Sequence, residues 1–482
     1  MSRATARRAL PTITLSSGAS GPIGRQIFRQ LKDLIRTGRL RNGSRLPSTR
    51  QLATELGVSR NVVVFAYEEL RAESYIVSLV GAGSYVATSR HRGVPVPTAR
   101  PSRSDRMPSS GRSPISVEPG FRIGEPFEID LPAIDVFPRK LWAKIAANRY
   151  ATSLRDLLSR AETGGYLPLR QAIAEHVHET RGIDCEPDQV IIVTGQGQAI
   201  SLAASLLIES GDAGFVENPT RLGIRQILRA AGARLVAVPV DHEEFDVAAA
   251  RAAAPQARFA LVTPSSHFPL GFAMRPTERA ALAEWAYERD GRWILEDDTG
   301  HDLTPSGSWQ PPLWSSAIGR VVYFSSFRPT LAPSLRLGFI IAPKRLVDPM
   351  LSARALTDGY RAPLEQAILN DFIASGHYAQ HIRDMRQIYA DRQAALAAAV
   401  AEHLPGIVLP GPSAAGLHTM CRLASPLRDV EIVAKVGDRF VLRALSTFYE
   451  GATEANALLL GHAQMNAAEI RREIRRLAAA LG

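Results

Sequence analysis

LPSTRQLATELGVSRNVVVFAYEELRAES, residues 46–74, holds two short helical segments with a tight turn between them. Ser48 precedes the first segment, where a serine side chain can accept hydrogen bonds from the free N–H groups of the first turn. Gly57 ends that segment, and Ser59 is placed to cap the second. Two short helices joined by a glycine-containing turn are typical of a helix-turn-helix, whose second helix lies in the major groove of DNA.

The sequence on both sides of this stretch completes a small domain. Upstream, apolar residues at helical spacing from Ile23 onward predict another helix that ends near Leu40. Downstream, YIVSLVGAGSYVA (75–87) predicts a two-stranded hairpin with a glycine-rich tip, which would form a wing. We therefore expect a winged helix-turn-helix over residues 21–87, preceded by an N-terminal tail, residues 1–20.

Four polar residues at the helix starts are candidates for DNA contact. Arg60 and Asn61 open the second helix, and these residue types suit bidentate contacts to guanine and adenine, respectively. Ser48 and Arg50 open the first helix, where side chains and N–H groups can meet phosphates. The alternative is a surface three-helix bundle with ordinary solvated arginines, which accounts less well for the helix caps and the wing.

The segment 88–120 is rich in proline, serine and arginine, with prolines at 95, 97, 101, 108 and 114. It has almost no bulky apolar residues, so it cannot form a core, and we expect an extended, positively charged linker. The whole chain has a formal net charge of +10 and a pI of about 9.9, which favours an anionic partner. Its 482 residues are too many for one core, so at least two domains are expected.

Residues 121–482 alternate apolar β-rich runs with Ala- and Leu-rich helical stretches, which predicts an α/β domain. VTGQGQAISLAASLL joins a strand to a helix through Gly195, Gln196 and Gly197, whose backbone N–H groups can bind an anion. WILEDDTG places Asp297 among three carboxylates at the end of a buried strand, where open α/β sheets bind ligands. A solvated acidic strand end is the alternative interpretation.

The first domain closely resembles the winged helix of GntR-type regulators, through its LPS-R-LA, GVSR and G-GS-YV elements. This resemblance implies that six residues face the DNA: Arg50, Ser59, Arg60, Asn61, Gly81 and Gly83. Asn61 stands where these regulators usually have threonine, so the operator sequence does not follow from the resemblance.

From about Phe121 onward, the chain resembles the aminotransferase-like domain of MocR-type regulators, a GntR subgroup. The strings that carry the likeness include DLPAIDVFPRKLW, GYLPLRQAI, VTPSSHFPLGFAM, LEDD and PTLAPSLRLG. The resemblance implies a fold-type-I, pyridoxal 5′-phosphate-dependent transferase-like domain. In such a domain the turn at Gly195, Gln196 and Gly197, together with Arg336, would hold the cofactor's phosphate. Asp297 would pair with the pyridine nitrogen.

Several positions depart from the family's pattern. The lysine that forms the Schiff base corresponds to Pro329, which is preceded by Arg328. Thr299 and Arg221 stand where a tyrosine and an aromatic residue are usual, and Ser266 and His267 stand where histidine and glutamine are common. The chain has only five lysines, none of them in the loop that carries Pro329. Proline has no primary amine and arginine stays protonated, so we predict no ordinary aminotransferase activity.

Two interpretations of the ligand remain open. Pyridoxal phosphate could bind without a covalent bond, or Arg221, Arg328 and Arg336 could form a cationic pocket for another anionic metabolite. In the structural alternative, Arg221 and Arg328 pair with neighbouring carboxylates, namely Glu296, Asp298 or Glu217. No metal-ligand cluster is apparent, and we expect His301, His418 and His462 to be hydrogen-bonded structural groups.

We expect a homodimeric transcription regulator that binds double-stranded operator DNA and senses a small-molecule effector. A pyridoxal phosphate-dependent aminotransferase with an accessory DNA-binding domain is the alternative, and a constitutive repressor without a ligand is a third. Cys185 and Cys421 show no disulfide or metal-like spacing, which fits the cytoplasm. No stretch approaches the ~20 apolar residues that span a membrane, so no membrane partner is expected.

Overall fold

The computed structural model describes residues 13–16, 21–79, 83–87, 122, 124–159, 162–241, 244–304, 310–405, 408–410, 416–424 and 427–481. The chain divides into two compact units, residues 1–107 and 108–482. The expected linker at 88–120, most of the tail 1–20, and Gly81 lie outside the described residues, so the predictions made for them stay predictions.

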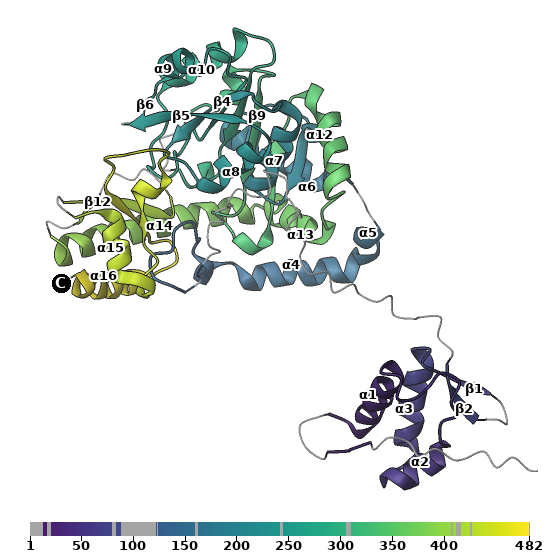
Figure 1. Cartoon of the computed structure of the whole chain (residues 1–482). Coiled ribbons are helices and arrows are strands. Elements are labelled where there is room, and N and C mark those ends of the chain that lie inside the picture. Colours follow the sequence, from purple (N-terminus) through teal and green to yellow (C-terminus); the bar gives the residue numbers. More distant parts are fainter. Residues whose placement is uncertain are drawn as a thin grey trace, which may run out of the picture. The chain divides into compact units, whose positions relative to one another are not determined.

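The first unit consists of three helices and a hairpin (Figure 1). Their bounds are α1 Ile23–Arg36, α2 Thr49–Leu56, α3 Arg60–Ala72, β1 Ile76–Leu79 and β2 Gly83–Val86. The two strands are antiparallel, with Ile76 opposite Val86. Both of these residues join one apolar core with side chains from all three helices, among them Ile27, Leu52 and Val63. This is the winged helix-turn-helix that the sequence predicts.

Local signals place most of the helix ends in this unit. The Ser48 hydroxyl accepts a hydrogen bond from the Gln51 N–H at 3.2 Å, which caps α2 as predicted. Gly57 ends α2 with a left-handed φ of 65°. Ser59 occupies the N-cap of α3 in extended geometry but its side chain makes no capping hydrogen bond, so that detail of the prediction was wrong. The first helix ends at Arg36, one turn earlier than expected.

The second unit is built on an eight-stranded sheet with the order β3-β10-β9-β8-β7-β4-β5-β6. The strands β9, β8, β7, β4 and β5 are parallel, and β10 is antiparallel to both β3 and β9. The bounds are β3 Val190–Val193, β4 Ala213–Asn218, β5 Arg234–Asp241, β6 Glu244–Phe245, β7 Phe259–Val262, β8 Trp293–Asp297, β9 Val321–Ser326 and β10 Gly338–Ile341.

Helices cover both faces of this sheet. Successive strand residues alternate between two apolar cores: Val321 and Tyr323 of β9 enter one, and Val322 and Phe324 enter the other. The first core includes α6 (Leu167–Arg181), α10 (Pro276–Tyr287) and α13 (Pro363–Ala374). The second includes α7 (Gln196–Leu207), α8 (Leu222–Ala230) and α12 (Lys344–Thr357). Four further helices of this unit are α4 Arg139–Thr152, α5 Leu154–Ser159, α9 Val247–Ala253 and α11 Leu313–Ser316.

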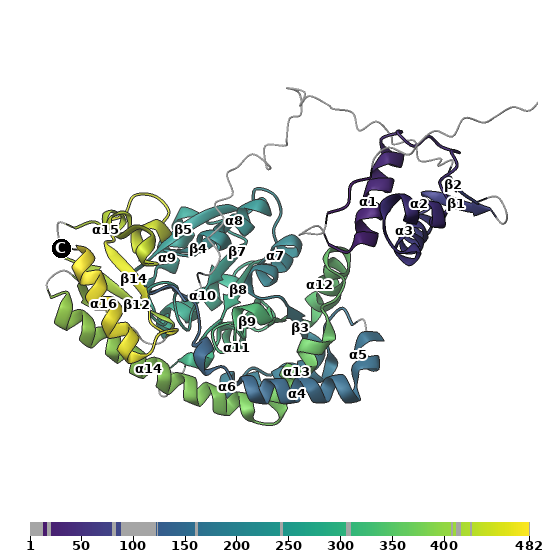
Figure 2. The same cartoon turned by 90° about the horizontal axis from the view of Figure 1, so that it is seen from below.

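A smaller four-stranded sheet has the order β11-β12-β14-β13, with bounds Val408–Pro410, His418–Leu423, Ala457–Gly461 and Arg443–Ala444. Beside it α14 (His377–His403) packs along α16 (Ala467–Leu481), as Figure 2 shows, and α15 spans Asp429–Val436. The segment before α4 joins this part of the unit, because the Gly461 N–H donates to the Phe127 carbonyl at 2.9 Å. A Cβ at Gly461 would lie 1.9 Å from the Glu128 carbonyl oxygen, so this close approach requires glycine.

The α/β fold class expected for the large unit is confirmed by this architecture. Among the described residues, no helix is both long enough and apolar enough to cross a membrane.

Candidate functional site

The predicted DNA-contacting residues come together at the starts of two helices. Ser48 and Arg50 lie at the start of α2, Arg60 and Asn61 at the start of α3, and all four are exposed. Arg60 Nε lies 3.5 Å from Thr49 Oγ1, which brings the two helix starts side by side. Exposed basic and polar groups at adjacent helix N-termini can reach both phosphates and base edges.

Two further residues predicted to contact DNA are exposed. Gly83, predicted as a DNA contact, opens β2, and Ser59 precedes α3. Arg45 was not predicted, yet its guanidinium lies against the wing: a Cβ at Gly83 would be 3.3 Å from Arg45 Nε. The backbone of Arg45 also forms an antiparallel β-bridge with Tyr85 of β2. Nothing in the local sequence around Arg45 indicates that it meets a strand so far along the chain.

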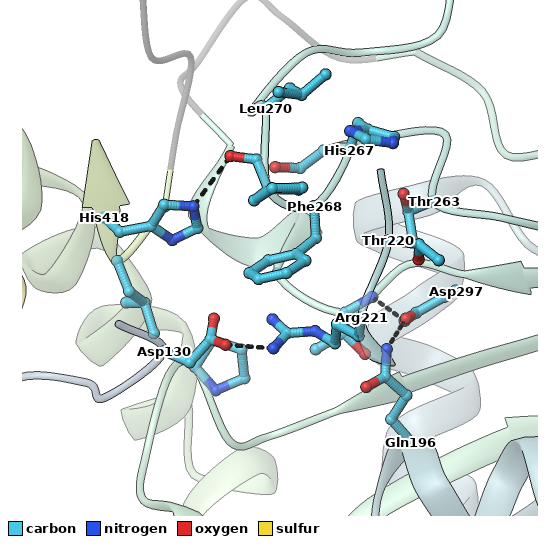
Figure 3. Close-up of a pocket in the computed structure, with 18 of the residues that line it drawn as sticks. Asp130, Gln196, Thr220, Arg221, Thr263, His267, Phe268, Leu270, Asp297 and His418 are labelled. Atoms are coloured by element: carbon cyan, nitrogen blue, oxygen red, sulfur yellow. Dashed lines mark hydrogen bonds and ion pairs between the residues drawn. The ribbon is translucent and has the colours of Figure 1, made fainter. Parts of the chain in front are cut away.

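In the large unit, a pocket opens at the carboxyl ends of β4, β7 and β8, as expected for an open α/β sheet (Figure 3). Six of the predicted site residues line it: Gln196, Arg221, Asp297, Thr299, Arg328 and Pro329. Its wall also takes residues from both ends of the unit, with Asp130 near the beginning and Leu417, His418 and Met420 near the small sheet.

Asp297, the last residue of β8, lies at the sheet end of this pocket and is buried. Both of its carboxylate oxygens already accept hydrogen bonds from the chain. The Thr299 N–H donates to Oδ1 at 3.0 Å, and the Gln196 side-chain amide donates to Oδ2. Burial raises the pKa of Asp297 above its ordinary value, although these hydrogen bonds oppose the shift.

Arg221 brings a positive charge into the pocket. Its guanidinium pairs with the Asp130 carboxylate and lies over the Phe268 ring, 3.5 Å from the centroid (Figure 3). Burial alone would raise the pKa of Asp130, but the nearby guanidinium groups of Arg221 and Arg328 together hold it well below its usual range. Asp130 also has a left-handed φ of 63°, a strained backbone conformation of the kind often found at functional sites.

Two of the remaining residues predicted for the phosphate cradle, Gly195 and Gly197, lie at the start of α7. Gly195 precedes the helix with a φ of 126°, and Gly197 is in its first turn. Arg336 is exposed, and its guanidinium lies 3.5 Å from the Thr194 hydroxyl. Gly195, Gly197 and Arg336 are not among the described residues that line the pocket, so the structure gathers only part of the predicted set in one cavity.

The two carboxylates that flank Asp297 have structural partners. Glu296 accepts hydrogen bonds from the N–H groups of Leu313 and Trp314 at 2.8 and 2.9 Å, at the start of α11. Asp298 accepts from Arg181 Nε at 2.7 Å and from the Tyr323 hydroxyl at 2.8 Å. The structural alternative for Arg221 therefore needs correction, because its ion pair is with Asp130.

Two histidines, His267 and His418, line the pocket. His267 is 4% exposed, and its Nε2 lies 3.8 Å from Glu217 Oε2. Burial lowers the pKa of His267 to about 3 and raises the pKa of Glu217 to about 8, so both are neutral near pH 7. His418 Nε2 bonds to the Pro269 carbonyl at 3.1 Å, which fits the structural role expected for it. For His462, expected to be hydrogen-bonded, neither ring nitrogen has a partner among the described residues.

Comparison with known proteins agrees with both units. Residues 23–86 match the family described as "Bacterial regulatory proteins, gntR family", and residues 138–477 match "Aminotransferase class I and II". The structure resembles an alpha-aminoadipate aminotransferase of Thermus thermophilus, with a TM-score of 0.66 at 25% identity over 73% of this chain and 90% of that chain.

Two curated relatives match nearly the whole length of the chain. The "Probable rhizopine catabolism regulatory protein MocR" of Rhizobium meliloti is 33% identical over 97% of this chain and 95% of that protein. The "HTH-type pyridoxine biosynthesis transcriptional regulator PdxR" of Corynebacterium glutamicum is 28% identical over 93% of this chain and 94% of that protein.

A gntR-type winged helix followed by an aminotransferase class I and II domain defines a class of bacterial helix-turn-helix regulators. The chain belongs to the MocR-type family of this class and is a transcription regulator.

Proposed function

We propose that the pocket of the large unit binds a small anionic metabolite without a covalent bond, and that this binding changes how a homodimer of the chain holds operator DNA. One observation carries the proposal: a largely buried arginine, Arg221, whose side chain is 13% exposed, lies in the pocket where a carboxylate of the same chain, Asp130, neutralises it. A ligand carboxylate or phosphate can take the place of Asp130 on the same guanidinium.

The residues of the pocket do not fit pyridoxal phosphate as a resident cofactor, although the fold is one that generally holds it. Pro329 lines the pocket at the position expected for the Schiff-base lysine. The described lining of the pocket contains no lysine. Asp297, expected to pair with a pyridine nitrogen, already accepts from Gln196 and Thr299. The same observations count against the aminotransferase alternative, because the described lining of the pocket offers no primary amine.

The walls of the pocket limit the size and chemistry of the ligand. Beside the arginines stand apolar side chains, among them Leu270, Leu417 and Met420, and the ring of Phe268. A ligand with one or two acidic groups and a short apolar body matches this lining. A large polyanion would leave the apolar wall exposed to water, so it would bind more weakly than a small ligand with an apolar body.

Displacement of Asp130 offers a route from the ligand to the rest of the chain. Asp130 belongs to the segment that begins the large unit, and its strained backbone is held in part by the pairing with Arg221. A ligand that replaces this pairing favours a different arrangement of the segment. Its effect on DNA binding is limited to the difference in its affinity for the two states.

Exposed apolar side chains support a second copy of the chain as a partner. Tyr150 of α4, Leu158 of α5 and Leu356 of α12 are 55%, 74% and 89% exposed. Exposed large apolar groups are typical of surfaces that another protein covers. We propose a homodimer through the large unit, which would present two winged helices to paired half-sites.

Ligand titration tests the proposal. Full-length protein is titrated with pyridoxal phosphate, followed by visible absorbance, borohydride reduction and intact mass, and separately with small mono- and dicarboxylates and phosphate esters, followed by thermal unfolding and operator binding. We expect no reducible adduct, and at least one anion that shifts both readouts. A reducible adduct would overturn the assignment of Pro329. If no anion changes operator binding, the constitutive repressor is the better description.

A further inference from the structure

Three side chains that can bind a metal converge outside the pocket. His176 comes from α6, and His301 and Asp302 come from the short helix His301–Leu303 after β8. The three residues are 9%, 6% and 8% exposed, and one ligand atom from each lies within 4.8 Å of the other two. The Asp302 Oδ1 atom is shared, at 3.2 Å from His176 Nε2 and 3.1 Å from His301 Nε2.

The hydrogen bonds of His301 decide which of its nitrogens is available. Its Nδ1 lies 2.9 Å from the Asp298 carbonyl, which can only accept, so Nδ1 carries a proton. In the neutral ring, Nε2 then presents a lone pair. This atom is buried and makes no hydrogen bond, although it lies 3.1 Å from a carboxylate oxygen. Two lone pairs at this distance repel each other unless a cation lies between them.

We propose that His176, His301 and Asp302 bind a divalent metal ion of the zinc type. Zinc–ligand distances of about 2.0–2.2 Å in a tetrahedron place neighbouring ligand atoms about 3.3–3.6 Å apart. The two measured nitrogen–oxygen separations, 3.2 and 3.1 Å, come within a few tenths of an ångström of this spacing. Two imidazoles and one carboxylate form a ligand set that suits Zn²⁺ and leaves a position for water.

Groups around the three ligands hold two of them in place. The Asp298 carbonyl accepts from His301 Nδ1, and the Tyr378 hydroxyl donates to Asp302 Oδ2 at 2.8 Å. Partners of this kind fix the tautomer and orientation of metal ligands. Tyr378 also contacts the Thr330 hydroxyl at 3.0 Å, and Thr330 follows Pro329 in the loop that lines the pocket.

The metal would therefore tie α6, the end of β8 and α14 together behind the pocket wall, in a structural role. Its presence does not depend on the ligand proposed for the pocket. The competing occupant of the same position is a proton shared between His301 and Asp302. If a shared proton occupies this position, the protein neither contains a metal ion nor binds one tightly there. Measurements of metal content and of metal affinity therefore distinguish the proton from the metal ion.

The experiment uses untagged full-length protein, freed of metal on a chelating resin and titrated with Zn²⁺ and with Co²⁺. We expect one equivalent of either ion per chain, a higher unfolding temperature with Zn²⁺, and visible Co²⁺ bands of a four-coordinate site. His301→Gln and His176→Gln should each weaken binding at least about tenfold, since the loss of a supporting partner alone costs that much.

His178→Gln is the matched control. His178 lies on the same helix, α6, but is exposed and bonds to Asp184 at 2.7 Å, so its replacement should leave affinity unchanged. Wild-type protein that binds no ion stoichiometrically would overturn the proposal, as would binding that His301→Gln leaves intact. If the variants fail to fold, the Co²⁺ spectrum of the wild-type protein decides by itself.

Discussion

The guanidinium of Arg221 lies 3.5 Å from the centroid of the Phe268 ring while it pairs with Asp130. The ring face and the carboxylate together hold a nearly buried cation in a pocket of which Pro329 forms one wall. In this respect the site differs from one prepared for a covalently held cofactor. It resembles a binding site that already contains its own counter-ion.

Asp130→Asn is expected to destabilise the protein and to strengthen its affinity for anions. The change leaves Arg221 without its carboxylate, and loss of one partner of a buried pair costs about 3–5 kcal/mol. Asparagine tolerates the left-handed backbone of this position, so the charge is the main variable. Thermal unfolding at increasing phosphate concentration measures both effects. Asp290→Asn, which changes a fully exposed carboxylate paired with Arg320, serves as the control and should change little. Equal phosphate dependence in both variants would contradict the anion pocket.

Pro329→Lys combined with Arg221→Tyr is expected to gain a borohydride-reducible adduct with pyridoxal phosphate. The pair of changes places a primary amine in the pocket and removes the guanidinium over Phe268. Absorbance and peptide mass mapping after reduction should locate the adduct at position 329. The parent protein treated in parallel is the control. If the adduct forms on another lysine, the loop does not correspond to the cofactor-binding loop of aminotransferases.

The pH dependence of stability should change at Glu217. In the folded protein the pKa of Glu217 is about 8, against an ordinary value of 4.5, so between these values the folded state binds the extra proton. Stability is therefore lost as pH rises through this window, by at most about 1.4 kcal/mol per pH unit. Glu217→Gln, which can keep accepting from the Thr263 N–H, should flatten this slope in urea unfolding curves measured from pH 5 to 8.

His267 should give the opposite pH dependence of stability. Its pKa is about 3 in the folded state and ordinarily 6.5, so the unfolded chain binds the extra proton and stability falls as pH drops below 6.5. The Glu217→Gln variant should keep this acid limb. A variant that loses both limbs together would show that the two groups titrate as one unit.

Arg60→Ala is expected to weaken DNA binding, whereas Arg71→Ala is not. Both side chains are exposed on α3, but Arg60 lies at its start beside α2 and Arg71 lies in its last turn. If Arg60 reads a base, its removal costs about 1–3 kcal/mol, and if it binds a phosphate, its removal lowers the salt slope by about 1. We would measure binding to the promoter region of the chain's own gene at several salt concentrations. These measurements distinguish a base contact of Arg60 from a phosphate contact. Equal weakening in both variants would indicate binding by net charge alone.

Gly461→Ala is expected to destabilise the large unit, because the new Cβ would meet the Glu128 carbonyl oxygen at 1.9 Å. Forcing atoms into such close approach costs about 1–3 kcal/mol or more. At Gly223, in α8, a Cβ meets nothing within 4 Å, so Gly223→Ala should be neutral or stabilise by up to about 1 kcal/mol. Chemical unfolding of the two variants compares them. A neutral Gly461→Ala would mean that the segment at Glu128 can move away.

The sequence predicted what depends on local pattern. Caps and glycines placed α2 and α3, and the strand-like run WILEDDTG placed the end of β8 where the pocket opens. Contacts between segments that lie far apart in the chain could not be predicted from the sequence. Asp130 carries no signal that it meets Arg221, and His176 none that it meets His301, because each pair forms only when separate elements pack. Gln196 was predicted through its backbone, yet its side chain contacts Asp297.

Asp130 and His418 line one pocket, although they lie near opposite ends of the large unit. The ribosome therefore finishes the winged helix early and completes the pocket only when β12 and β14 have emerged. At about 5–20 residues per second, the interval between Ala87 and Gly461 is roughly 20–75 s. During synthesis each chain has a finished winged helix well before the pocket for the proposed anionic ligand is complete, so every new molecule begins in the ligand-free form.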